Sequence, residues 1–208
     1  MRRLIRASGP FAPKPARGRS PYQSLIRSIA YQQLTGKAAE TILGRFFALY
    51  GEGRCPEPAE LLETTDESLR AVGFSRAKAA ALKDIAARSL DGTIPPRRSL
   101  ARLSDEAIIE RLTRVRGVGR WTVEMFLIFT LARPDVLPVD DYGVRSGFRL
   151  AHGLDDLPRP RDLAAHGLRW APHRSTAAWY LWRAVDLHRS GELPSPPGAG
   201  RNVARARP

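Results

Sequence analysis

The chain has 208 residues, of which 43% are hydrophobic, so it is long enough for one large or two small domains with a buried core. The longest apolar run, residues 125–132, is far shorter than the roughly 20 residues of a membrane span, and we expect no signal peptide. The single cysteine, Cys55, excludes an intramolecular disulfide and a cysteine-ligated zinc or iron–sulfur site, so we expect a cytoplasmic, nucleoid-associated protein. The net charge of +13 suggests a polyanionic partner, but only four of the 34 basic residues are lysines, and genome composition can produce the same arginine excess.

Apolar spacing and capping residues predict helices along most of the chain. Thr64 and Glu67 match a capping box, and Ser75 and Ser104 are expected N-caps. No run of alternating β-branched residues indicates a strand, so we predict an all-α fold of about ten helices, with a disordered tail from about residue 191. The expected helices are a short one near the N-terminus, then 21–31, 35–50, 58–62, 64–73, 75–91, 104–112, one after residue 119, one through 144–148, one near Leu163, and 172–188.

A glycine turn separates the helix that ends near Leu112 from a long apolar helix. In the segment VRGVGRWT, Gly117 and Gly119 permit a tight turn and leave backbone N–H groups uncovered at a helix N-terminus. Such groups bind anions, and one DNA phosphate can be held this way without sequence reading. The alternative is a purely structural turn between two helices. The pattern LxxVxGVGRWT favours DNA binding.

Two adjacent carboxylates, Asp140 and Asp141, follow Pro138 where the chain enters the next helix. One of them can be an N-cap, which requires no catalytic role. Because adjacent acids rarely serve one purpose, the other can point into a cleft. There a carboxylate could stabilise a sugar cation and orient water against C1′, as glycosidic cleavage requires.

Two further features are ambiguous. Trp121 directly follows the glycine turn, with Met125 one helical turn later, so its ring is placed to stack on an extruded base, whereas most helical tryptophans are core residues. The segment Gln32-Gln33-Leu34 interrupts two helices. It is either a polar loop or a loop that enters the duplex and fills the space of a flipped base.

Five segments together resemble the helix-hairpin-helix DNA glycosylase superfamily, and within it the bacterial 3-methyladenine DNA glycosylase II branch. They run in the right order from Pro21 to about Asp186: SLIRSIAYQQLTGKAAETILGRF, VGFSRAKAAALKDIA, RVRGVGRWTVEMFLIF, LPVDDYGVRSGF and WAPHRSTAAWYLWR. The resemblance implies a helix-hairpin-helix fold of two helical subdomains, residues 21–133 and residues 1–20 with 134–208, flanking a DNA-binding cleft. It implies the compact form without an N-terminal β-domain, which puts any pocket contact from that domain in doubt.

The resemblance also implies roles for individual residues. The catalytic aspartate falls on Asp141, and the intercalating position falls on Gln33, with Leu34 as its rival. The implied pocket residues are Trp121, Met125 and Trp182. The implied DNA-binding residues are Gln33, Leu34 and Thr35 of the loop and Gly117, Gly119, Arg120 and Thr122 of the hairpin, while the main-chain carbonyls of Thr113, Val115 and Gly117 would hold a sodium or potassium ion.

Two departures from the family pattern narrow the chemistry. Bifunctional members carry a nucleophilic lysine where this chain has Trp121, so no Schiff base or lyase step is expected. The four-cysteine iron–sulfur cluster of the endonuclease III branch is absent, and no cofactor is required. We therefore expect a monomeric, monofunctional glycosylase that removes alkylated purines, chiefly 3-methyladenine, from double-stranded DNA. The alternatives are a glycosylase for oxidised or deaminated bases and a non-catalytic DNA-binding module.

Overall fold

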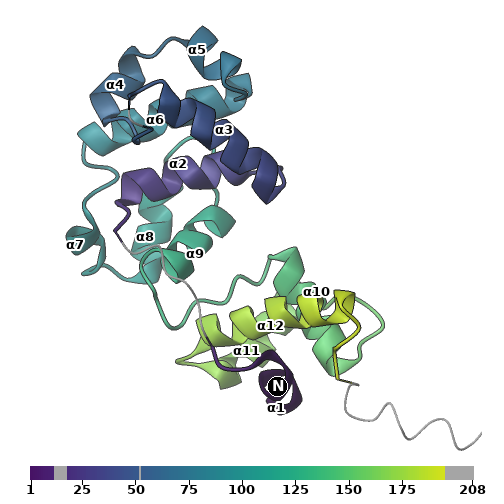
Figure 1. Ribbon diagram of the computed structural model, residues 1–208. Helices are drawn as coiled ribbons and strands as arrows, with labels where there is room; N and C mark the ends of the chain where they lie inside the picture. Colours follow the sequence, from purple (N-terminus) through teal and green to yellow (C-terminus); the bar gives the residue numbers. More distant parts are fainter. Residues whose placement is uncertain (12–17, 52, 195–208) are drawn as a thin grey trace, which may run out of the picture. The chain divides into compact units, whose positions relative to one another are not determined.

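The computed structural model describes residues 1–11, 18–51 and 53–194, and these residues form helices without strands, which confirms the all-α prediction (Figure 1). Contacts divide the chain into two compact units, Pro15–Leu131 and Met1–Lys14 with Ala132–Pro208. We call them the hairpin unit and the aspartate unit. The expected boundaries lay close by, after residues 20 and 133. No described helix is long and apolar enough to cross a membrane. Most of the tail expected to be disordered, residues 195–208, lies outside the described residues.

The hairpin unit is built on α2, whose apolar face is buried against neighbouring helices. Leu25, Ile26 and Ile29 of α2 are fully buried, as are Leu82 and Ile85 of α6, so these two helices share one core. Their burial removes several apolar side chains from water, at roughly 1.5–3 kcal/mol each. The helices of this unit are α2 (Pro21–Tyr31), α3 (Gly36–Ala48), α4 (Pro58–Glu63), α5 (Asp66–Ala71), α6 (Arg76–Leu90), α7 (Arg97–Leu100), α8 (Asp105–Leu112) and α9 (Arg120–Phe129).

Short-range capping sets most helix starts in this unit. Ser75 and Ser104 accept backbone N–H groups at the starts of α6 and α8, as predicted. The predicted cap at Thr64 is wrong by one residue, because Thr65 caps α5 through the Ser68 N–H. The Thr64 hydroxyl instead bonds Tyr50 Oη at 2.7 Å and the Glu60 carbonyl at 2.8 Å. A tertiary partner therefore decided between two adjacent threonines.

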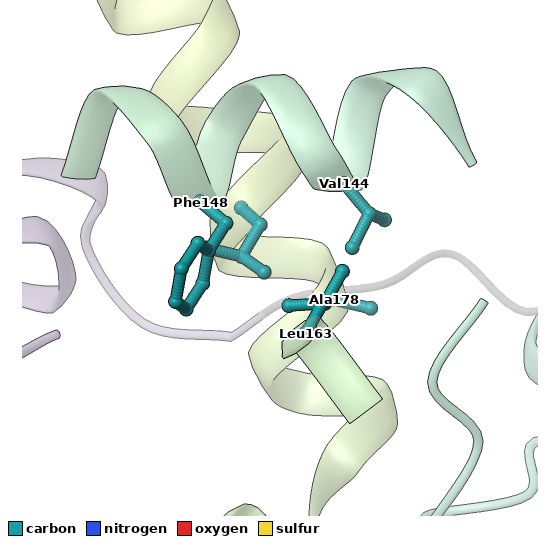
Figure 2. Close-up of a cluster of buried hydrophobic side chains, with 5 residues drawn as sticks. Val144, Phe148, Leu163 and Ala178 are labelled. Carbon is teal, nitrogen blue, oxygen red and sulfur yellow. The ribbon is translucent and has the colours of Figure 1, made fainter. Parts of the chain in front are cut away.

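The aspartate unit is organised by the packing of α10 against α12. Val144 and Phe148 of α10, Leu163 of α11 and Ala178 of α12 form its apolar cluster (Figure 2). Gly147 makes the approach possible, because a Cβ there would lie 1.9 Å from the Leu181 carbonyl oxygen. The elements of this unit are α1 (Arg2–Ser8), α10 (Tyr142–His152), α11 (Pro160–Gly167), a 3₁₀ turn (Leu168–Trp170) and α12 (Arg174–Arg189).

Helix α12 begins two residues later than predicted, at Arg174 instead of Pro172. The Arg174 guanidinium donates to both carboxylate oxygens of Asp135, at 2.7 and 2.8 Å, and the Arg174 backbone N–H also donates to Asp135 at 3.2 Å. The Ala171–Pro172 peptide, just before the helix, is cis. This ion pair holds the segment that follows the hairpin unit to the start of α12.

Candidate DNA-binding and active-site residues

Gly117 shapes the turn between α8 and α9. Its φ of +76° is a left-handed conformation that favours glycine. A Cβ on Gly117 would also lie 3.1 Å from Ala81 Cβ and 3.4 Å from Ile29 Cδ1. Gly117 therefore lets the hairpin turn pack directly on α2 and α6, which fixes its position within the unit.

Gly119 serves a different purpose at the other end of the turn. It is the N-cap of α9, with an ordinary φ of −92°, and no side chain caps this helix. An added Cβ at Gly119 would meet nothing within 4 Å, so neither backbone conformation nor packing requires glycine here. What glycine does is leave the exposed N-terminus of α9 uncovered, as an external anion would require.

The remaining hairpin candidates make contacts inside the protein. Arg120 donates to both oxygens of Glu106, at 2.7 and 2.9 Å, and to Glu124 at 3.2 Å. Its guanidinium holds the pKa of the Glu106 carboxyl below its usual range. Thr122 is only 4% exposed. The Arg116 N–H donates to Asp84 at 2.7 Å, so one turn N–H already has an internal acceptor. DNA contacts of Arg120 and Thr122 stay predictions.

The loop between α2 and α3 presents two exposed side chains. Gln33 has a φ of +56°, unusual for a residue with a side chain, and Leu34 is 39% exposed. Both are accessible, so the structure does not decide which of them is the wedge, the intercalating side chain that would enter the duplex. Thr35 is the N-cap of α3, and its Oγ1 accepts the Ala38 N–H at 3.4 Å, as predicted from its position. Its DNA-binding role stays a prediction.

A cavity of about 500 Å³ opens beside Trp121 in the hairpin unit. Trp121 and Met125 line it on α9, and Ser24 and Ser28 line it on α2. The size is in the range of small-molecule sites. The sequence analysis did not single out these serines, although their i, i+4 spacing places both hydroxyls on one face of α2. Ser24 is 6% exposed, and its Oγ is buried without a hydrogen-bond partner.

Asp141 is the N-cap of α10 in the aspartate unit. Its Oδ1 accepts the Val144 N–H at 2.7 Å and the Trp182 Nε1–H at 2.8 Å. Of the two acids, the cap is therefore Asp141, the residue that the family resemblance implies is catalytic, while Asp140 is exposed. The catalytic role of Asp141 stays a prediction. Two donors from different helices hold the Asp141 carboxylate in one orientation.

Gly143 makes the contact between Asp141 and Trp182 possible. A Cβ there would lie 2.8 Å from Trp182 Cδ1 and 3.1 Å from Asp141 Oδ1. Trp182, predicted as a pocket wall, thus has a hydrogen-bonding contact that the sequence did not indicate. The predicted enclosure of a base by Trp121 and Trp182 combines residues of both units and stays a prediction.

Comparison with known proteins assigns the chain to a family. Residues 26–173 match the model described as HhH-GPD superfamily base excision DNA repair protein. The chain belongs to this superfamily. It is 43% identical over 187 residues to DNA-3-methyladenine glycosylase 1 of Schizosaccharomyces pombe, a match that covers 89% of the chain and 82% of that protein.

Solved structures of superfamily members have the same fold. One is an S. pombe 3-methyladenine DNA glycosylase in complex with abasic DNA, with a TM-score of 0.81, 44% identity, and coverage of 88% of this chain and 89% of that one. Another is a DNA-3-methyladenine glycosidase from Bacillus halodurans, with a TM-score of 0.80, 34% identity, and coverage of 90% and 86%. These matches confirm the helix-hairpin-helix glycosylase fold predicted from the motifs.

The cation implied by the family resemblance would bind at hairpin carbonyls. The Val115 carbonyl accepts the Val118 N–H at 3.1 Å, and the Gly117 carbonyl accepts Gln32 Nε2–H at 2.9 Å. Each carbonyl oxygen has a second lone pair, so these groups, with that of Thr113, fit a monovalent cation. Among the described residues, no three His, Cys, Asp or Glu side chains are grouped as metal ligands. The cation stays a prediction.

Proposed function

We propose that this protein is a monofunctional DNA glycosylase that excises alkylated purines, 3-methyladenine and also 7-methylpurines, from duplex DNA in base excision repair. Its relatives are named 3-methyladenine glycosylases, and one is solved with abasic DNA. The observation that carries the chemistry is the Asp141 carboxylate, which two donors hold at Oδ1. A positioned carboxylate is what hydrolysis of a glycosidic bond requires.

DNA binding is assigned to the hairpin and the α2–α3 loop. The N-terminus of α9, uncovered at Gly119, supplies N–H donors for one backbone phosphate. A monovalent cation on the carbonyls of Thr113, Val115 and Gly117 would add positive charge beside that phosphate. Gln33 or Leu34 enters the duplex as the damaged nucleotide rotates out.

The cavity beside Trp121 favours a cationic base. The indole is electron-rich, and stacking on it stabilises a positive ring by roughly 0.5–2 kcal/mol. Met125 and Phe126 complete an apolar wall. A neutral oxidised or deaminated base would depend on hydrogen bonds to its edge, which Trp121, Met125 and Phe126 supply poorly, so only the hydroxyls of Ser24 and Ser28 across the cavity could serve it. Alkylated purines carry the positive charge that such a pocket recognises.

Asp141 acts on the sugar. As the bond to the base breaks, its carboxylate stabilises the oxocarbenium-like transition state and orients water toward C1′. An alkylated, positively charged purine leaves without strong protonation, so no general acid is needed. With Trp121 in the position of the lyase lysine, no amine at that position attacks the sugar, and the product is an intact strand with an abasic site.

Asp141→Asn tests this assignment. Asparagine is an equally good N-cap and retains an oxygen at Oδ1, so only the charge is lost. We expect single-turnover release of 7-methylguanine from duplex DNA to fall at least about 100-fold, with affinity for abasic DNA unchanged.

The matched control is Asp140→Asn, which changes the exposed neighbour and should release base at the wild-type rate. Equal release by Asp141→Asn would rule out the mechanism. Strand cleavage by the wild type before alkali treatment would contradict the monofunctional assignment. Binding without release of any base would favour a non-catalytic DNA-binding module.

A further inference from the structure

The α2–α3 loop is tied to two other segments of the hairpin unit. Lys78, near the start of α6, donates from Nζ to the carbonyls of Ala30 at 2.9 Å and Gln32 at 2.7 Å. The Gln32 side chain donates from Nε2 to the Gly117 carbonyl at 2.9 Å. The Lys78 ammonium group thus binds main-chain carbonyls at the start of the loop, and the Gln32 side chain links the loop to the hairpin turn.

These contacts act where α2 ends. The last carbonyls of a helix have no partner within it, and a lysine ammonium there satisfies them and interacts favourably with the helix dipole. The carbonyl of Gln32 directly precedes Gln33, whose left-handed backbone is strained for a residue with a side chain and persists only where its surroundings enforce it. Lys78 and Gln32 supply contacts on the N-terminal side of that strained residue.

We propose that Lys78 and Gln32 are positioning residues that hold the α2–α3 loop, residues 32–35, rigidly against the phosphate-binding hairpin. We call this loop the wedge loop. This inference rests on the proposed function. The hairpin fixes the DNA backbone by binding a phosphate. The side chain of Gln33 or Leu34 can then separate stacked bases only if the loop that carries it does not move away from the DNA. The bond from Gln32 to Gly117 provides that link, and Lys78 keeps Gln32 in place.

The proposal predicts a dependence on base pairing. Extruding a paired base from the duplex costs more free energy than extruding an unpaired base. A loosened wedge should therefore slow excision of a paired lesion and leave excision of an unpaired lesion nearly unchanged. A merely structural role of Lys78 would lower both rates together.

The experiment compares Lys78→Met and Gln32→Met with Lys83→Met. Methionine keeps an unbranched apolar stem and removes the donors. Lys83 lies on the same helix, but its Nζ donates to the Leu62 carbonyl at 3.2 Å, away from the loop. Single-turnover release of 7-methylguanine is measured with the lesion opposite cytosine and opposite an abasic-site analogue.

We expect Lys78→Met to lower release of the paired lesion at least tenfold and release of the unpaired lesion less than threefold. Gln32→Met should show the same selectivity with a smaller loss, and Lys83→Met should match the wild type on both substrates. Equal losses on both substrates, or no loss, would overturn the proposal. If Lys78→Met unfolds, Gln32→Met decides by the same ratio.

A second measurement separates this proposal from the proposed function. In duplex DNA with an abasic-site analogue, 2-aminopurine beside the gap reports wedge insertion without any bond cleavage. Lys78→Met should reduce the fluorescence change at saturating protein, and Lys83→Met should not. A wild type that releases no base overturns the glycosylase assignment, while this signal still decides whether Lys78 positions the wedge.

Discussion

The N-termini of α9 and α10 both present backbone N–H groups, but their N-cap residues treat these groups in opposite ways. The N-cap of α9 is Gly119, which brings no side chain to the N-terminal N–H groups of that helix. The N-cap of α10 is Asp141, whose own carboxylate accepts the Val144 N–H. Both ends carry the partial positive charge of a helix N-terminus. One leaves this charge for an anion from outside, and the other holds its own anion in place.

The two caps also differ in what they contribute to the stability of their helices. A Gly N-cap costs only a few tenths of a kcal/mol relative to a good cap, so α9 gives up little stability. At α10 the stabilising cap is also the candidate catalytic group, and Trp182 adds a second donor from α12. The same hydrogen bonds then stabilise the helix start and orient the carboxylate.

Gly119→Asp would convert the first helix start into the second. Its φ and ψ, −92° and 170°, suit a capping aspartate. The new carboxylate should raise the free energy of unfolding by roughly a few tenths of a kcal/mol and oppose the DNA phosphate. We expect affinity for abasic duplex DNA, measured by fluorescence anisotropy at fixed salt, to fall at least about tenfold.

Gly119→Ser is the control, because serine also caps but brings no charge. It should weaken binding much less than the aspartate. Wild-type affinity in Gly119→Asp would show that this helix end holds no phosphate.

Trp182→Phe tests the aspartate side of the comparison. It keeps an aromatic ring and removes the N–H that donates to Asp141 Oδ1. A hydrogen bond to a charged group contributes about 1.5–3 kcal/mol, so kcat should fall roughly tenfold while affinity for abasic DNA holds. Trp179→Phe is the control, since Trp179 packs edge-on against Phe11 and Tyr180. Equal kcat values for the two variants would mean that the cap alone orients Asp141.

The smallest expected effect is a pH dependence of stability, and it arises in the aspartate unit. Burial lowers the pKa of His152 and His166, and all four histidines of the chain lie in the aspartate unit. The unfolded chain binds more protons below about pH 6.5, so the free energy of unfolding should fall as the pH drops from there toward the lower folded pKa values.

His166→Phe should reduce this loss of stability at acidic pH. The difference in Tm between about pH 7.5 and pH 5.5 is expected to shrink by a few degrees or less relative to the wild type. An unchanged difference would show that His166 takes up no extra proton on unfolding.

Local patterns predicted the elements and the hairpin. Ser75, Ser104 and Thr35 cap their helices as expected, because a cap uses N–H groups two or three residues away. The glycine turn could also be predicted from local sequence, because the left-handed φ of Gly117 depends on the residue's own backbone. The choice of Thr65 over Thr64 could not be predicted from the sequence, because Tyr50, which bonds the Thr64 hydroxyl, lies 14 residues away in the turn after α3.

The sequence by itself determined an all-α chain, most of its helix starts, a hairpin with an open N-terminus, and a pair of candidate acids. Only the tertiary structure decided that Asp141 is both cap and partner of Trp182, that Gly143 makes room for this contact, and that Lys78 donates to the carbonyl of Gln32. The contacts of Asp141 with Trp182 and of Lys78 with Gln32 join residues more than 40 positions apart. Capping and helix periodicity act within one or two turns, whereas hydrogen bonds between helices depend on how those helices pack.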